Sequence, residues 1–114
     1  MQRFILLFSL LGLLFLTTNC SKNATMSSLE FLETGCSNPW KSKNGKSEAE
    51  VKTVVIDFLE NDLMIANFKL AITFDENEAQ GCYACHCKTG RKIIVEVEKG
   101  FVPILEDNGF SLKN

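Results

Sequence analysis

Four of the five cysteines carry the most concentrated chemistry of this chain. Three of them lie in the short run Cys82-Tyr83-Ala84-Cys85-His86-Cys87, and the fourth is Cys36. Thiols at this density form disulfides, bind a soft metal or exchange disulfides with a partner. The fifth cysteine, Cys20, lies at the end of a hydrophobic leader and makes the total odd.

Structural disulfides are the first interpretation of Cys36, Cys82, Cys85 and Cys87. Exported chains enter an oxidising compartment where cysteines normally pair, and four cysteines allow three pairings. A Cys85–Cys87 bridge would close a very tight ring, which disfavours the pairing that contains it. Cys36 then pairs with Cys85 or Cys87, and we favour Cys36–Cys87 with Cys82–Cys85. A bridge from Cys36 to the cluster closes a loop of about 50 residues and stabilises the domain by roughly 4 kcal/mol.

A metal site is the second interpretation, with zinc or copper held by Cys36, Cys82, Cys85, His86 and Cys87. A zinc site usually has a second matched cysteine pair, whereas Cys36 is alone. Thiol–disulfide exchange through Cys82 and Cys85 is the third interpretation. A reactive cysteine often lies at a helix N-terminus, whereas the residues after Cys85 have the pattern of a strand. We therefore predict no metal, no cofactor and no catalytic residue, and keep both alternatives.

The alternation of inward and outward side chains along the strand after the cluster predicts which residues of the cluster face the core. If that strand extends back through Lys88 without a bulge, residues 85 and 87 share the phase of Ile93 and face the core. His86 would then face solvent beside a disulfide, with an acid–base role alongside Asp75, Glu76 or Glu78 as the alternative. Gly90 is the position where a bulge would break this phase.

Trp40 and Tyr83 are the only tryptophan and the only tyrosine, and both lie near cysteines in the sequence. We predict that they pack in the core, with a binding patch as the alternative.

The N-terminus has the three parts of an export signal. Arg3 supplies a positive charge, Phe4 to Leu16 is an apolar stretch of 13 residues broken by Ser9 and Gly12, and residues 17–19 are polar. A membrane-spanning helix needs roughly 20 apolar residues, so this stretch predicts a signal peptide over residues 1–19.

The segment Leu16-Thr17-Thr18-Asn19-Cys20-Ser21-Lys22 resembles the lipobox of bacterial lipoproteins. Thr17 replaces the usual leucine and Asn19 the usual small residue. The resemblance implies cleavage before Cys20, attachment of palmitate-type lipid to Cys20, and anchoring of the chain to a membrane of the cell envelope. Ser21 implies the outer membrane by the same resemblance. The alternative is an ordinary secretory signal cut near Asn19, with Cys20 as a free or paired thiol.

The size and net charge of the chain that remains after cleavage limit its possible folds and functions. Loss of residues 1–19 leaves 95 residues with 11 basic and 14 acidic side chains, a net charge of −3. This charge excludes the broad basic surface of a nucleic-acid binder. A chain of this length forms one small domain that benefits from cross-links. We predict a lipidated cysteine and flexible tether over residues 20–28 and a single domain over residues 29–114.

The pattern of the domain predicts the order (β)-α-β-β-α. Residues 47–61 form the clearest helix, because Ser47 and Glu50 fit a capping box and one apolar stripe follows, consisting of Val51, Val54, Val55, Phe58 and Leu59. Alternation of apolar residues predicts strands over 68–74 and 93–98, and residues 27–34 form a first strand or an irregular lead-in.

A short helix over 101–108 follows, with Pro103 in its first turn and Gly109 at its end, and Phe110 can pack back onto the core. The resulting fold is an α+β two-layer domain with helices on one face of an antiparallel sheet, compatible with a truncated ferredoxin-like topology.

These observations predict a small, lipid-anchored, disulfide-stabilised α+β domain of the cell envelope. No phosphate-binding loop, nucleophile elbow, zinc-protease or dinucleotide-binding motif occurs in the sequence. We expect a non-catalytic interaction or accessory role towards an envelope protein or a small ligand, with no nucleic-acid partner.

Overall fold

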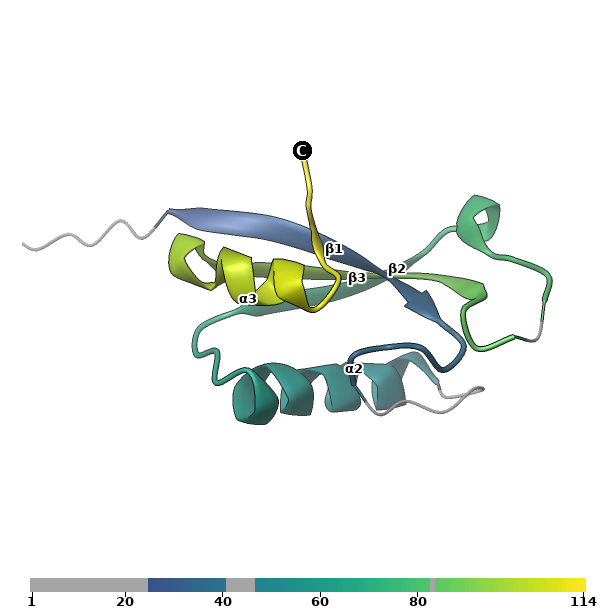
Figure 1. Cartoon of the computed structure of the whole chain (residues 1–114), viewed down its shortest axis with the longest axis horizontal. Coiled ribbons are helices and arrows are strands. Elements are labelled where there is room, and N and C mark those ends of the chain that lie inside the picture. Colours follow the sequence, from purple (N-terminus) through teal and green to yellow (C-terminus); the bar gives the residue numbers. More distant parts are fainter. Residues whose placement is uncertain (1–24, 41–46, 83) are drawn as a thin grey trace, which may run out of the picture.

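A four-stranded antiparallel sheet forms the frame of the domain (Figure 1). The computed structural model describes residues 25–40, 47–82 and 84–114. The strands are β1 (Met26–Thr34), β2 (Lys69–Phe74), β3 (Lys88–Glu98) and β4 (Ser111–Leu112), in the spatial order β2-β3-β1-β4. The helices lie between β1 and β2 and between β3 and β4, which confirms the α+β class. The chain order and strand order together are those of the ferredoxin-like split βαβ arrangement.

The register of the strands places their apolar residues on one face of the sheet. Leu29 of β1 lies opposite Val95 of β3, and Phe31 lies opposite Ile93. On the other side of β3, Leu70 of β2 also lies opposite Val95. Directly opposed residues share a face, so the predicted period of two produces a continuous apolar surface beneath the helices. Leu29, Ile93 and Val95 are fully buried.

The first helix, α2 (Glu48–Asp57), begins where its capping residue predicts. The Ser47 hydroxyl accepts a hydrogen bond from the backbone N–H of Glu50 at 3.3 Å. The helix continues into a wider π-helical turn, η1 (Phe58–Asp62), in which the Leu63 N–H donates to the Phe58 carbonyl at 3.0 Å. The predicted stripe packs on the sheet, with its residues Val51, Val55, Phe58 and Leu59 all buried.

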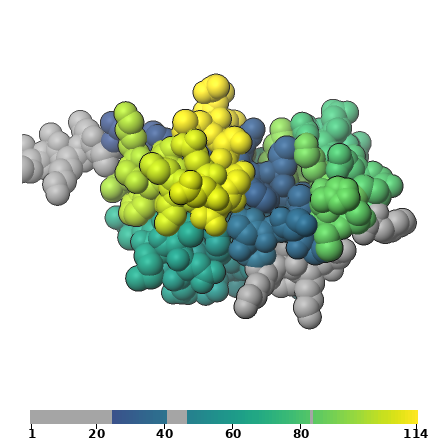
Figure 2. All heavy atoms as spheres, viewed as in Figure 1, coloured from purple at the N-terminus to yellow at the C-terminus, as the bar shows by residue number. Residues whose placement is uncertain are grey.

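The C-terminal elements close the other part of the core. A 3-10 turn, η3 (Lys99–Phe101), leads into α3 (Val102–Asp107), which has Pro103 in its first turn. Gly109 has a φ of 91° and ends the helix, as predicted. Phe110 then returns to the core with 3% of its surface exposed. Figure 2 shows this C-terminal segment in yellow directly beside the teal spheres of the α2 region.

The start of the first strand and the presence of a fourth strand differ from the sequence-based expectation. The first strand begins at Met26, so the part of the predicted tether over residues 26–28 belongs to the sheet. Met26 pairs with Glu98, and the Thr25 carbonyl accepts a hydrogen bond from the Lys99 N–H at 3.2 Å. Strand β4 was not predicted, because two residues carry no recognisable alternation.

Several predictions concern residues outside the described ranges. The signal peptide over 1–19, the lipidated Cys20 and Tyr83 are among them. Within the described residues, no helix has the length and apolar character needed to cross a bilayer.

Candidate functional site at the disulfide-bonded end of the sheet

Two disulfides join the four cysteines of the domain at one end of the sheet. Cys36 is bonded to Cys85, with their Cα atoms 4.5 Å apart, and Cys82 is bonded to Cys87, with a Cα separation of 6.0 Å. The predicted disulfide state is confirmed, and so is the absence of a Cys85–Cys87 bridge. The favoured pairing, Cys36–Cys87 with Cys82–Cys85, is wrong.

A turn within the cluster explains the pairing. The Cys87 N–H donates to the Ala84 carbonyl at 3.0 Å, so residues 84–87 form a turn and the strand begins only at Lys88. The segment after β1 pairs with this turn: the Cys36 N–H donates to the Cys85 carbonyl at 3.0 Å. Backbone pairing therefore places Cys36 beside Cys85, and Cys82 reaches Cys87 across the turn.

The turn also changes which cysteines face the core. Cys87 has 3% of its surface exposed, whereas Cys85 is exposed. The predicted burial is therefore right for Cys87 and wrong for Cys85, because the two residues do not lie on one extended strand. Cys36, Cys82 and His86 are also exposed, and the exposure of His86 confirms its predicted position at the surface.

A bulge in β3 separates the cysteine turn from the regular part of the sheet. Leu32 pairs with Lys92 and Thr34 pairs with Lys88, so Glu33 alone faces residues 89–91. Gly90 occupies the middle of the bulge with a φ of 98°. A β-carbon there would lie 2.7 Å from Cε2 of Phe74, so both the backbone conformation and the close approach require glycine. The bulge that would break the predicted phase is therefore present.

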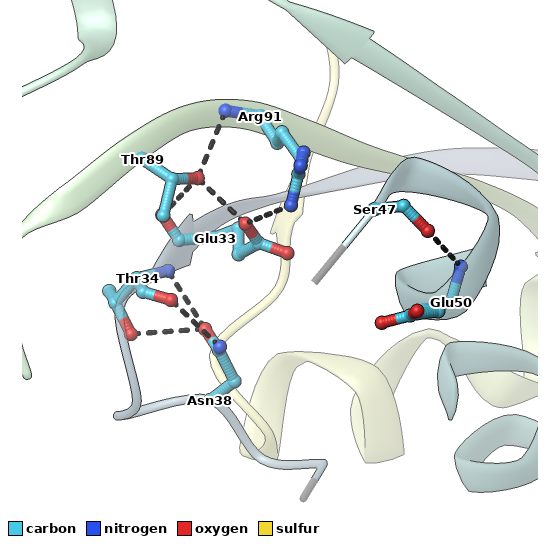
Figure 3. A network of polar contacts seen from close by, with 7 residues as sticks. All are labelled: Glu33, Thr34, Asn38, Ser47, Glu50, Thr89 and Arg91. Atoms are coloured by element: carbon cyan, nitrogen blue, oxygen red, sulfur yellow. Dashed lines mark hydrogen bonds and ion pairs between the residues drawn. The ribbon is translucent and has the colours of Figure 1, made fainter. Parts of the chain in front are cut away.

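A buried carboxylate holds the bulge (Figure 3). Glu33 has 3% of its surface exposed, and its Oε1 accepts hydrogen bonds from the Thr89 hydroxyl at 2.8 Å and from Nη1 of Arg91 at 3.2 Å. The Thr89 hydroxyl in turn accepts from the Arg91 N–H at 3.2 Å. This polar group was not predicted from the sequence, although Glu33 alternates in step with Leu29 and Phe31 on the core side of the strand.

A second polar group shapes the loop that carries Cys36 (Figure 3). The Thr34 N–H donates to Oδ1 of Asn38 at 2.8 Å, and Nδ2 of Asn38 donates back to the Thr34 carbonyl at 2.9 Å. The Ser37 N–H donates to the Thr34 hydroxyl at 3.0 Å. These bonds fold residues 34–38 into a tight loop and hold Cys36 in position for its disulfide.

Trp40 anchors the same loop in the core. Its ring centroid lies 5.0 Å from that of Phe31, 6.0 Å from that of Phe58 and 6.3 Å from that of Phe110. The side chain has 3% of its surface exposed. Core packing, the predicted role of Trp40, is confirmed, since edge-on and tilted aromatic pairs of this kind stabilise a core beyond simple burial.

Among the acidic residues before the cluster, Asp75 has structural partners. The Asp75 carboxylate accepts from the Asn77 N–H at 3.0 Å and caps a 3-10 turn, η2 (Glu76–Glu78). Nζ of Lys92 lies 3.9 Å from Oδ2 of Asp75. Asp75 therefore serves as a turn cap and ion-pair partner within the β2–β3 connection.

With the cysteines bonded in this way, the described residues form neither the metal site nor the C-x-x-C exchange site. The four sulfurs are bonded in two pairs, and the described residues contain no group of three or more histidine, cysteine or acidic side chains placed to hold a metal ion. Disulfide exchange through a C-x-x-C motif would need a Cys82–Cys85 bond, whereas the structure gives each of these cysteines another partner.

These features define a small α+β domain stabilised by two disulfides. At one end of its sheet, the buried Glu33 carboxylate with its partly exposed partner Arg91, the glycine bulge and the cross-linked loops form a single unit. Figure 2 shows the green cysteine region against the blue segment after β1. Comparisons with protein-family models, curated proteins and solved structures find no match to this chain.

Proposed function

We propose that this protein is a lipid-anchored cell-envelope lipoprotein whose domain acts by interaction and not by catalysis. The observation that carries the proposal is the closed pairing of Cys36 with Cys85 and of Cys82 with Cys87. This pairing uses an even set of cysteines and leaves Cys20 as the odd one, at the position of the lipobox cysteine.

The disulfides and the lipid anchor both imply that the domain lies outside the cytosol. Disulfides form and persist outside the reducing cytosol, which agrees with an export signal over residues 1–19. Cys20 then becomes the first residue of the mature chain and carries fatty chains, which exceed the two-signal requirement for stable membrane attachment.

The exposed end of the domain is the candidate contact surface. It combines His86 with the rigid, cross-linked loops around Cys36 and Cys85. A surface that is already ordered loses little conformational entropy on binding, which favours interaction with an envelope protein or a small ligand.

Intact-mass measurement of the protein purified from its membrane without reducing agent tests this proposal. We expect a chain that starts at Cys20, has the added mass of a diacylglyceryl group and fatty acid, and lacks two hydrogens for each of two disulfides. A Cys20→Ser variant should keep both disulfides and lose the lipid. An unlipidated chain starting near Cys20 would overturn the anchor, and four free thiols would overturn the oxidised domain.

The metal-site alternative uses the same sulfur atoms and therefore excludes the disulfides. Its donors would be the thiolates of Cys36, Cys82, Cys85 and Cys87 with the imidazole of His86, a set that suits zinc or cuprous copper. Elemental analysis of protein purified without added metal, with and without prior thiol reduction, distinguishes the two. Stoichiometric zinc or copper together with an absence of disulfide mass loss would favour the metal site.

A further inference from the structure

The start of β1 fixes which end of the domain lies near the anchor. Thr25, the first described residue, comes five positions after Cys20, and five extended residues span at most about 18 Å. If Cys20 carries lipid, as proposed above, Met26 cannot lie far from the bilayer surface. The anchor therefore restricts the orientation of the whole domain, because β1 runs through the sheet as a rigid element.

The elements beside Met26 form one end of the molecule, opposite the disulfides (Figure 1). Met26 pairs with Glu98, after which β3 continues into η3, and β2 begins nearby with Lys69 opposite Glu96. The loop from α2 to β2 enters the sheet at this end as well. At the other end of β1, Thr34 pairs with Lys88 beside the cysteine turn. Eight residue steps along β1 place the two ends about 26 Å apart.

The end near Met26 exposes apolar side chains. Met64, in the loop before β2, has 74% of its surface exposed, and Met26 has 41% exposed. Met64 also has a φ of 55°, in the left-handed region that methionine rarely adopts. A left-handed non-glycine residue costs about 1–3 kcal/mol. The fold therefore maintains a strained backbone at a residue whose apolar side chain lies in water.

We propose that the end of the domain formed by Met26, Met64 and Lys99 rests on the membrane surface, with the disulfide-bonded end pointing away from it. The unbranched methionine side chains enter the interface between headgroups and acyl chains, where apolar groups leave water. Lys69 and Lys99 are exposed at the same end and can keep their ammonium groups at the headgroups.

Electrostatic attraction does not hold the Met26 end of the domain on the membrane. Glu98 lies opposite Met26 and Glu96 opposite Lys69 in the sheet, and Glu60 and Asp62 are exposed in η1 just before Met64. The two lysines therefore give this end no excess of positive charge. The contact is therefore an apolar one supported by the nearby anchor, and we expect little dependence on anionic lipid. The consequence is that His86 and the Cys36–Cys85 disulfide are presented to a partner away from the membrane.

Site-specific photo-crosslinking tests the orientation. The oxidised mature chain, residues 20–114, is coupled through the Cys20 thiol to a maleimide-bearing lipid in vesicles of phosphatidylethanolamine and phosphatidylglycerol. A diazirine amino acid replaces either Met64 or His86. We expect several-fold more lipid adduct from position 64 than from position 86, and the same ratio in vesicles without phosphatidylglycerol. Equal adduct at both positions, or more at 86, would overturn the orientation.

A substitution at Met64 separates membrane contact from folding. Asparagine tolerates the left-handed conformation, so Met64→Asn should fold at least as stably while losing apolar contact. With the diazirine at position 26, we expect Met64→Asn to lower the lipid adduct and leave the melting temperature unchanged or raised. If the yield of lipid adduct at position 26 is unchanged, Met64 does not contact the membrane. The lipid is attached chemically in this experiment, so the result does not depend on whether Cys20 is lipidated in the cell. The intact mass of the protein purified from its membrane tests that lipidation separately.

Discussion

Cys36 and Cys85 lie 4.5 Å apart between Cα atoms although 49 residues separate them in the chain. Their bond joins the loop after β1 to the turn before β3, so it encloses α2 and β2. The second disulfide joins residues only five apart, Cys82 and Cys87. Both bonds include a cysteine of the turn at residues 84–87, but they constrain very different lengths of unfolded chain.

The two disulfides should therefore contribute unequally to stability. Loop-closure entropy gives about 4 kcal/mol for the Cys36–Cys85 loop and about 2 kcal/mol for the Cys82–Cys87 loop. We expect the Cys36→Ala/Cys85→Ala variant to lose about twice as much unfolding free energy as the Cys82→Ala/Cys87→Ala variant. Urea denaturation of both variants measures this ratio, and free-thiol titration checks that each keeps its remaining bond. A larger loss from the short loop would contradict the entropic explanation.

The bulge gives a second prediction, at Gly90. Alanine there must adopt a φ near 98° and place its β-carbon 2.7 Å from Phe74. We expect Gly90→Ala to lower the unfolding free energy by about 1–3 kcal/mol. Gly100→Ala is the matched control, because a β-carbon added there would meet no atom within 4 Å, and it should change stability by less than about 1 kcal/mol in either direction. Thermal unfolding of both proteins gives the comparison, and similar losses would argue against a special role for Gly90.

Local patterns predicted the elements of the fold well, because they depend on near neighbours. The stripe from Val51 to Leu59 predicts a helix whatever lies opposite it, and alternation around Val95 predicts a strand in the same way. The short strand β4 has no such pattern. It exists because Leu112 lies opposite Leu29 and the Lys113 N–H donates to the Ser28 carbonyl at 2.9 Å.

The candidate site was harder to predict, because it depends on contacts between distant residues. The disulfide pairing follows from the turn at residues 84–87 and from the bulge, and a small change in register there exchanges Cys85 for Cys87. The partners Glu33 and Arg91 are 58 residues apart. Only the shared phase of Glu33 with Leu29 and Phe31 indicates in the sequence that this carboxylate is buried.

A third prediction concerns the start of α2. Ser47 supplies the capping oxygen for the Glu50 N–H, and its removal leaves a helix N-terminal donor without this partner. We expect Ser47→Ala to lower the unfolding free energy by about 1 kcal/mol and Ser47→Asp to restore it, since aspartate is an equally good cap and favours the positive end of the helix dipole. Chemical denaturation checks both. Equal loss in the two variants would mean that the hydroxyl matters for another reason.

The last prediction concerns Glu33, whose Oε1 accepts hydrogen bonds from Thr89 and Arg91 while the carboxylate lies almost fully buried. Glu33→Ala removes the acceptor for both donors next to the bulge, and we expect a loss of about 1–3 kcal/mol. Glu33→Gln keeps a carbonyl oxygen for Thr89 but removes the charge opposite Arg91, so its loss should be smaller.

Glu30→Ala is the matched control for Glu33, because Glu30 lies on the same strand with its side chain on the opposite face. We expect a change of less than about 0.5 kcal/mol there. A double-mutant cycle between Glu33 and Arg91, measured by urea denaturation, isolates the ion pair from the hydroxyl contact. The Arg91 side chain is 27% exposed, so solvent screens the pair and a coupling below about 1 kcal/mol is expected. If the alanine variant is as stable as the parent and the coupling is zero, Glu33 does not hold the bulge, and the disulfides alone must fix this end of the sheet.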